Sequence, residues 1–357
     1  MRADLALVGF GHVGRRFAGL LEKRRDWLAL DYEPDCRIIG IATAHHGCLF
    51  RAQGIDAVTA AGRQGQQPLD PDAARAADSF EVIRSLAGSD SPLKIMVETT
   101  TLDIAAGQPA IDHVRAALES GCHVVTANKG PAAFAYEELS ALAADRGVSF
   151  LFEGAVMDGI PVFNLVRETL PAVDILGFRG VINSTTNHIL TAIEDGESFD
   201  GALARMQAEG IAEADPSLDV DGWDAAAKTA ALANVLMRAR MTPQAVEREG
   251  IGQATARLAM AAKGRGARIR LVASATRTAG GVATSVRPIE LPENDLLAGL
   301  RGVSNALILQ TDLLGEIAMT QLAGGLTQTA YALLSDLVTV GRRHRQGLSA
   351  AAPGRSR

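Results

Sequence analysis

The sequence is short of cysteine, of long apolar runs and of positive charge. Its three cysteines, Cys36, Cys48 and Cys122, show no CxxC spacing, which argues against a disulfide framework or a cysteine zinc site and predicts a reducing cytoplasm. No stretch reaches the ~18 uninterrupted apolar residues of a membrane helix, and the N-terminus does not follow the pattern of a secretory signal. A net charge of −6 gives no attraction for nucleic acid or anionic membrane. We therefore expect a small-molecule partner, and neither nucleic acid nor a membrane.

What is present is the composition of a globular protein, with 47% hydrophobic and 21% charged residues over a length sufficient for two domains. Over residues 1–155, strand-like segments alternate with helix-like ones. The strand candidates are ADLALV, CRIIGIATA, PLKIMVETT, CHVVTAN and VSFLFEG. This alternation predicts an α/β fold in which the first domain is a doubly wound parallel sheet of the Rossmann type.

The pattern changes after this point, and residues 156–318 are expected to form a second α/β domain with a mixed sheet. Its longer strand candidates are ILGFRGVINSTTNHIL, ARIRLVASATR and GVATSVRPIEL. Residues 319–341 resume helical periodicity and predict a C-terminal helix that returns towards the first domain. The basic, small-residue tail 342–357 is expected to be disordered.

A glycine turn follows the first predicted strand. Gly9, Gly11 and Gly14, with His12 and Val13 among the intervening residues, fit the pattern GxGxxG between a strand and a helix. The first glycine permits the tight turn, the second allows backbone to approach a pyrophosphate, and the third allows close packing of helix and strand. The phosphate would lie at the helix N-terminus, where free N–H groups favour anions. The motif predicts a bound dinucleotide.

The end of the second predicted strand bears on which coenzyme is used. An NAD-selective domain of this type places an acid there to bond the ribose 2′-hydroxyl and repel a 2′-phosphate. Here RIIGIATAHHG ends in Thr43, Ala44, His45 and His46, without an acid. We expect NADP to be accepted and modestly preferred, while NAD also works.

An acidic segment precedes a single lysine, Lys228, in GIAEADPSLDVDGWDAAAKTAALANVLM. Asp221 or a neighbour is expected to cap a helix on which Asp224 and Lys228 are four residues apart and share a face. One interpretation is a surface ion pair, worth under ~1 kcal/mol. The other is a partly buried lysine that exchanges a proton with a substrate hydroxyl while carboxylates hold a substrate ammonium. Small, apolar flanking residues favour the second interpretation.

Together with the glycine turn, the segments CHVVTANKGP, FEGAVMDGIPVF, GFRGVINSTTNHIL and AEADPSLDVDGWDAAAK occur in the order found in homoserine dehydrogenases, and the chain resembles that family over about residues 3–340. It is similar to the short form without the regulatory ACT domain. The resemblance implies a homodimer that interconverts L-homoserine and L-aspartate 4-semialdehyde with NAD(P), in threonine and methionine biosynthesis.

The resemblance also assigns site residues. It implies that Lys228 is the catalytic lysine, assisted by Asp224, and that Lys129 of the Ala-Asn-Lys motif is a second active-site lysine. The implied substrate-binding residues are Glu213, Asp219, Asp224 and Thr185. Besides the glycine turn, the expected cofactor contacts are Thr99, Thr100, Asn128 and Lys129. A monovalent cation, expected to be sodium, would be held mainly by backbone carbonyls of the loop with Glu153, Val156, Asp158 and Ile160.

Two alternatives remain open at this point. Another two-domain amino-acid dehydrogenase would keep the glycine turn but need different acids near the lysine. The second alternative is a dinucleotide-binding sensor that has lost catalytic activity. The presence of both lysines and the three acids argues against it. Aspartate semialdehyde dehydrogenase is disfavoured because it needs a cysteine nucleophile, and no cysteine lies in the predicted substrate domain.

Overall fold

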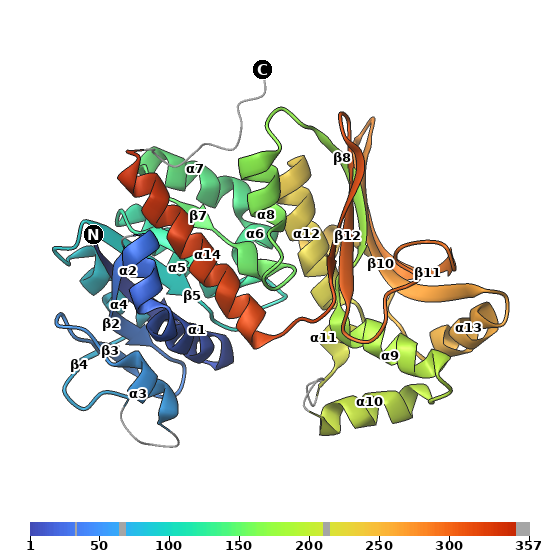
Figure 1. Cartoon of the computed structure of the whole chain (residues 1–357), viewed down its shortest axis with the longest axis horizontal. Helices are drawn as coiled ribbons and strands as arrows, with labels where there is room; N and C mark the ends of the chain where they lie inside the picture. Colours follow the sequence, from blue (N-terminus) through green and yellow to red (C-terminus); the bar gives the residue numbers. More distant parts are fainter. Residues whose placement is uncertain (33, 64–68, 210–214, 348–357) are drawn as a thin grey trace. The chain divides into compact units, whose positions relative to one another are not determined.

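The computed structural model describes residues 1–32, 34–63, 69–209 and 215–347. Two compact units make up the described chain (Figure 1). The first takes its described residues from Met1–Pro161 and Gly325–Arg357, and the second from Val162–Gly324. In the part of the chain that the structure describes, no helix is both long and apolar enough to cross a bilayer.

The first unit is built on a seven-stranded sheet with the order β4-β3-β2-β1-β5-β6-β7. Its strands are β1 (Arg2–Val8), β2 (Asp35–Ala42), β3 (Cys48–Phe50), β4 (Ala74–Ala76), β5 (Leu93–Glu98), β6 (His123–Thr126) and β7 (Phe150–Leu151). The run from β2 through β1 and β5 to β7 is parallel, whereas β3 and β4 are joined antiparallel at the β2 edge. The predicted doubly wound sheet is therefore confirmed.

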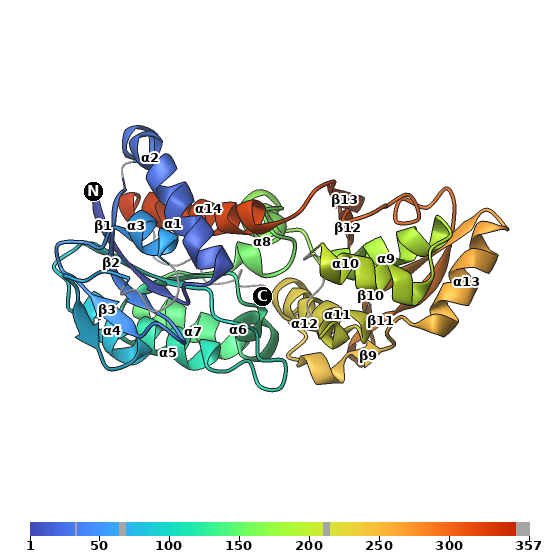
Figure 2. The same cartoon turned by 90° about the horizontal axis from the view of Figure 1, so that it is seen from below.

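Helices cover both faces of this sheet, which explains why its central strands are apolar almost throughout. They are α1 (His12–Lys23), α2 (Arg25–Asp31), α3 (Ala57–Gly62), α4 (Ser79–Ala87), α5 (Ala110–Glu119), α6 (Lys129–Phe134), α7 (Tyr136–Arg146), the 3₁₀ turn η1 (Glu153–Ala155) and α14 (Leu326–Arg345). Figure 2 shows α1 and α14 on one side of the sheet and α4, α5 and α7 on the other. Leu333 and Leu337 of α14 join Phe17 of α1 in one core cluster.

The second unit contains a six-stranded sheet with the order β13-β12-β8-β10-β11-β9. Its strands are β8 (Ile175–Val181), β9 (Glu247–Arg248), β10 (Ala267–Thr278), β11 (Gly281–Pro292), β12 (Asn305–Thr311) and β13 (Gly315–Gln321). All neighbours are antiparallel except β11 and β9, so the sheet is mixed, as predicted.

The helical elements of the second unit are α8 (Val162–Asn164), the π turn η2 (Leu165–Thr169), α9 (Ser184–Glu194), α10 (Phe199–Ala208), α11 (Ser217–Val220), α12 (Trp223–Met237), the 3₁₀ turn η3 (Pro243–Ala245) and α13 (Gln253–Lys263). Helix α12 packs on β10 and β11 through buried alanines such as Ala226 and Ala230. Because alanine has a small side chain, the helix can lie close to the sheet.

Three sequence expectations differ from the structure. The long strand predicted for ILGFRGVINSTTNHIL is wrong in its second half, because β8 ends at Val181 and α9 begins at Ser184. The first unit extends to Pro161 rather than to residue 155. Helix α14 continues to Arg345, past the expected end at 341, because its last turn carries the basic residues that favour a helix C-terminus. Residues 348–357 of the expected tail lie outside the described residues.

Candidate active site

The glycine turn joins β1 to α1 and leaves no room for side chains at two of its three glycines. Gly9 has φ +93°, and a Cβ there would lie 2.5 Å from the carbonyl carbon of Thr99. A Cβ at Gly14 would lie 2.7 Å from the carbonyl oxygen of Gly9. Gly11, by contrast, is exposed and has open space where its Cβ would be. The turn therefore packs tightly on one side and presents bare backbone on the other.

This open side fits a dinucleotide pyrophosphate. Helix α1 begins at His12 directly after Gly11, and no side-chain hydrogen bond caps its described N-terminus. The first N–H groups of a helix that lack a side-chain cap attract anions, and a glycine without a Cβ lets a phosphate approach them. His12 is exposed and Val13 half-buried at the same turn. The residues present therefore fit the group that the motif predicts.

The other expected cofactor residues lie at the same edge of the parallel sheet. The Thr99 hydroxyl donates to the carbonyl of Gly9 at 2.8 Å, so the end of β5 is attached to the glycine turn. The amide of Asn128 donates to the carbonyl of Thr100 at 3.1 Å, and its oxygen accepts from Gly130 N at 2.8 Å to cap α6. Lys129 is the first residue of that helix. Ligands of doubly wound folds bind at this edge, beyond the carboxyl ends of the strands.

The second unit assembles the acidic residues around Lys228. The Lys228 ammonium lies 2.9 Å from a carboxylate oxygen of Asp224 and donates to the carbonyl of Ile182 at 2.8 Å. Only 15% of the Lys228 side chain and 17% of the Asp224 side chain are exposed, so this is not the surface ion pair of the alternative interpretation. Partial burial strengthens the interaction between the two charges.

Asn183 links the two carboxylates of the cluster. Its amide nitrogen donates to Asp219 at 2.6 Å and to Asp224 at 3.0 Å. Burial raises the pKa of the Asp219 carboxyl, and the negative charge of Asp224 raises it further. Hydrogen bonds from Asn183 and Thr185 and the positive charge of Lys228 act in the opposite direction. The arrangement concentrates negative charge beside a lysine, which suits a ligand with an ammonium group.

Local structure explains why these side chains converge. Asn183 has extended backbone dihedrals and caps α9 by accepting from Thr186 N at 2.8 Å, so it lies at the exact junction of β8 and α9. Gly222, with φ +81°, precedes α12 and turns the chain so that Asp224 and Lys228 fall in its first two turns. Of the expected N-cap residues, Asp221 or a neighbour, it is the neighbour Gly222 that occupies the cap position, without a side-chain hydrogen bond, while Asp221 ends α11.

Two expected sites are less complete in the structure. Glu213 lies outside the described residues. In the loop expected to hold a cation, the Asp158 carboxylate is occupied within the protein, accepting from Gly325 N at 3.1 Å and from the Thr329 hydroxyl at 2.9 Å. Glu153 N donates to Asp336 at 2.8 Å. No cluster of three or more His, Cys, Asp or Glu residues suited to a metal occurs among the described residues, so a cation there would depend on backbone carbonyls such as those of Val156 and Ile160.

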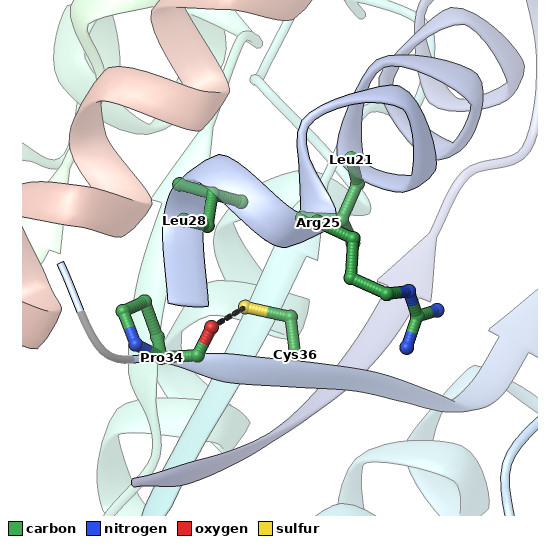
Figure 3. A pocket seen from close by; sticks show the side chains of 5 residues that line it. All are labelled: Leu21, Arg25, Leu28, Pro34 and Cys36. Atoms are coloured by element: carbon green, nitrogen blue, oxygen red, sulfur yellow. Dashed lines mark hydrogen bonds between the residues drawn. The ribbon is translucent and has the colours of Figure 1, made fainter. Parts of the chain in front are cut away.

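A small hollow elsewhere in the first unit is not a candidate for the coenzyme (Figure 3). It is lined by Leu21, Arg25, Leu28, Pro34 and Cys36. Cys36 lies at the start of β2, whereas the glycine turn lies beyond the carboxyl ends of the parallel strands. The hollow is therefore at the opposite end of the sheet from the expected ligand edge.

Sequence reasoning missed Asn183 and Glu98 as members of these networks. Asn183 falls within the segment expected to be a long strand, and its partners are 36 and 41 residues away along the chain. Glu98, at the end of β5, is wholly buried and accepts hydrogen bonds from Thr100 in the loop after β5 and from Thr126 at the end of β6. The signal in the sequence is a carboxylate at the end of a strand whose other residues, apart from Lys94, are apolar.

Comparison with known proteins gives one consistent result. Residues 9–153 match a model of the homoserine dehydrogenase NAD-binding domain, and residues 161–338 match a model of homoserine dehydrogenase. The chain is 37% identical to the NAD(+)-dependent homoserine dehydrogenase of Pseudomonas canavaninivorans, over 94% of this chain and 95% of that protein. It is 34% identical to the homoserine dehydrogenase of Methanocaldococcus jannaschii, over 94% and 98% of the two chains.

Solved structures agree. A homoserine dehydrogenase from Thiobacillus denitrificans superposes with a TM-score of 0.81 at 31% identity, covering 97% of this chain and 74% of that one. A hyperthermophilic archaeal homoserine dehydrogenase in complex with NADPH superposes with a TM-score of 0.78 at 27% identity, covering 96% and 98%. The chain therefore belongs to the homoserine dehydrogenase family of NAD(P)-dependent oxidoreductases.

Proposed function

We propose that this chain interconverts L-homoserine and L-aspartate 4-semialdehyde through the cluster of Lys228, Asp224, Asn183 and Asp219. The observation that carries the proposal is the placement of one half-buried lysine against a carboxylate and a main-chain carbonyl, beside a second carboxylate. The coenzyme supplies the hydride acceptor when NAD(P)+ is bound. The protein must then accept the proton of the substrate hydroxyl, because the alcohol carbon loses a hydride as its oxygen loses a proton.

Lys228 is the group proposed to exchange this proton. In the direction of alcohol oxidation its neutral amine accepts the hydroxyl proton, and in the direction of aldehyde reduction its ammonium returns it. Asp224, at 2.9 Å, orients the amine and stabilises the ammonium that forms. The carbonyl of Ile182 fixes the same nitrogen from a second direction, at 2.8 Å. Lys129, at the start of α6, is proposed as the second active-site lysine.

The remaining acids are proposed to hold the substrate ammonium. Asp219 is half-buried next to Asp224, so an ammonium placed there would relieve the repulsion between two carboxylates. Thr185 supports Asp219 with a hydrogen bond from α9. Glu213 is proposed as a further contact by resemblance to the family. An amino acid therefore suits this cluster better than a simple alcohol.

We propose that the enzyme accepts both coenzymes and modestly prefers NADP. Strand β2 ends at Ala42, and the turn from Thr43 to Gly47 contains no acid to repel a 2′-phosphate. His45 and His46 are exposed in this turn. Arg15 does not support the preference, since its guanidinium donates to the α3 carbonyl of Ala61 at 2.5 Å and to that of Arg63 at 3.2 Å. One relative is named as NAD(+)-dependent and another is in complex with NADPH.

Three further features are proposed by resemblance to the family. The chain works as a homodimer in threonine and methionine biosynthesis. Sodium is bound by carbonyls of the loop from Glu153 to Ile160. The enzyme acts in the cytoplasm, which is supported by the free state of Cys36, Cys48 and Cys122.

Replacement of Lys228 by methionine tests the proposed proton acceptor. Lys228→Met keeps the apolar stem but removes the amine, so kcat with L-homoserine should fall about 10²- to 10⁴-fold while coenzyme binding persists. The formation of reduced coenzyme is followed by absorbance. Lys263→Met is a matched control in the same unit, because the Lys263 ammonium donates to the helix-end carbonyl of Glu194 and has no part in the proposed reaction, so kcat should not change.

Near-normal turnover by Lys228→Met would remove this lysine from the mechanism. If the unaltered protein binds coenzyme but turns over no homoserine, it is a sensor or acts on another amino acid. A panel of hydroxylated amino acids distinguishes these two outcomes.

A further inference from the structure

Glu98 is a buried carboxyl that the proposed reaction does not use. It is the last residue of β5, and its side chain is wholly shielded from solvent. Carboxyl groups are costly to bury unless donors surround them. One oxygen of Glu98 accepts from the backbone N–H of Thr100 at 2.8 Å and also from the Thr100 hydroxyl. The other accepts from the Thr126 hydroxyl at 2.6 Å. The carboxyl therefore joins the ends of two neighbouring strands.

The bond to Thr126 extends to the turn that begins α6. Thr126 Oγ1 accepts from the backbone N–H of Asn128 at 2.9 Å. Asn128 in turn caps α6 through Gly130 N at 2.8 Å and donates to the carbonyl of Thr100 at 3.1 Å. The turn carrying Asn128 and Lys129 is thus tied to the loop after β5 twice, once directly and once through Glu98.

The loop after β5 is also attached to the glycine turn. Thr99 N donates to the carbonyl of Val8 at 2.8 Å, and its hydroxyl donates to the carbonyl of Gly9, also at 2.8 Å. A Cβ on Gly9 would collide with the backbone of Thr99 and Thr100. Any displacement of Thr100 would therefore disturb the turn that receives the pyrophosphate. Three loops at one edge of the sheet depend on the placement of Glu98.

We propose that Glu98 is a positioning residue for the coenzyme: it holds the loop after β5 and the turn before α6 in the conformation that NAD(P) binds. Burial raises the pKa of the Glu98 carboxyl, and the hydrogen bonds from Thr100, Thr126 and Asn128 offset part of this rise. The protein therefore replaces the lost solvation of this carboxyl with hydrogen bonds. The inference rests on the family's NAD(P)-binding role for this unit. Glu98 acts through its neighbours and does not touch the reacting atoms.

Two substitutions at Glu98 separate its bonds from its bulk. Glu98→Ala removes every bond and should weaken binding of NADPH and NADH about tenfold or more, measured by fluorescence titration. Glu98→Gln keeps an oxygen for Thr100 N and turns its amide towards Thr126 Oγ1, which can accept, so it should restore most of the affinity. The KM for homoserine at saturating coenzyme should stay within about twofold in both variants, because its proposed binding groups lie in the other unit.

Thr126→Val provides a second route in case Glu98→Ala does not fold. It keeps the shape of the side chain while removing the hydroxyl between Glu98 and Asn128, and should weaken coenzyme binding about threefold or more. Ile95→Val is the control for general destabilisation. Ile95 is fully buried in β5, the strand that ends in Glu98, and its apolar side chain makes no hydrogen bond to either loop, so the substitution creates only a small packing defect. It should lower the melting temperature without changing coenzyme affinity.

The inference is overturned if both Glu98→Gln and Thr126→Val fold and the dissociation constants of Thr126→Val for both coenzymes stay within about twofold of those of the unaltered protein. A lowered melting temperature with unchanged affinity would show a purely structural role. Failure of the proposed reaction looks different, because the unaltered protein would then bind coenzyme without oxidising homoserine, and the Glu98 variants would still lose affinity.

Discussion

Asn183 shows how one amide can influence the charge of the proposed substrate site. Its amide nitrogen donates to both Asp219 and Asp224 while its amide oxygen caps α9. These three hydrogen bonds require one orientation of the amide group. The raised pKa of Asp219 means that this acid takes up a proton at a higher pH than an ordinary aspartate. Below that pKa it is neutral and no longer attracts an ammonium, so homoserine affinity should decline as the pH falls through it.

Asn183→Asp should strengthen this dependence. The new carboxylate keeps an oxygen for Thr186 N and therefore keeps the cap, but it replaces a donor with a third negative charge beside Asp219 and Asp224. The pKa of Asp219 rises further, so the KM for homoserine should increase about 3- to 10-fold and its rise should begin at a higher pH. The measurement is the pH profile of KM, with Asp219→Asn as a reference that lacks this titration. An unchanged profile in Asn183→Asp would show that Asp219 does not bind the ammonium.

The same raised pKa has a consequence for stability with the opposite sign. The folded state holds the Asp219 proton more tightly than the unfolded state does, so its contribution is present below the unfolded pKa and is lost as pH rises through the folded pKa. Ionisation of Asp219 therefore lowers the free energy of unfolding. This fits a residue kept for binding.

At this scale the sequence predicted contacts between near neighbours and missed those between distant ones. Asp224 and Lys228 are four residues apart on a helix, so their contact follows from helical geometry alone. The bonds of Asn183 and of Glu98 join residues that only the fold brings together, and one such pair, Glu98 and Thr126, is 28 residues apart. No periodicity carries that information.

Among the elements, the parallel strands of the first unit were predicted because parallel strands buried on both faces are continuously apolar. The short antiparallel strands β3 and β4 were not predicted. The error in the second unit has a local cause. Ser184–Glu194 contains Thr185, Thr186 and Ile189, whose branched side chains favour strands, yet it forms α9. Asn183 caps this helix, and the Thr186 hydroxyl bonds back to Asn183, so capping outweighs the β propensity. The site depends on this junction.

The turn after β2 is the element that we propose to contact the ribose of the coenzyme. Thr43 closes it by accepting from His46 N at 2.7 Å and donating to the carbonyl of Gly47 at 3.0 Å, while Ala44 is exposed and makes room for a larger side chain. Ala44→Asp should therefore fold normally and raise the KM for NADP about tenfold relative to that for NAD, through repulsion of the 2′-phosphate. Steady-state kinetics with both coenzymes measure this ratio. Ala44→Asn, of the same shape without the charge, should change it little.

If Ala44→Asp raises the KM for both coenzymes equally, the turn does not contact the ribose. Strict NAD specificity of the unaltered protein would also contradict the proposed preference.

For the whole molecule, the important feature is that the chain leaves the first unit after Pro161 and re-enters it at Gly325. The order of motifs along the sequence predicted two domains, but it could not predict that both crossings are attached to one residue. Asp158, three positions before the first crossing, accepts hydrogen bonds from Gly325 N and from Thr329 at the start of α14. Its backbone is left-handed, with φ 47°, a conformation that aspartate and asparagine tolerate better than most residues.

Asp158→Ala should therefore loosen both crossings at once. It removes two hydrogen bonds to a charged acceptor and places alanine in a left-handed conformation, for a loss of about 2 kcal/mol and a fall of about 5 °C in melting temperature. Asp158→Asn should retain most of the stability, because its oxygen can accept from Gly325 N while its amide faces the Thr329 hydroxyl. Thr329→Val removes only the hydroxyl bond and should fall between the two. In the proposed reaction the first unit binds the coenzyme and the second unit binds homoserine, so kcat should follow the same order. Equal melting temperatures for all three variants would show that Asp158 does not hold the crossings.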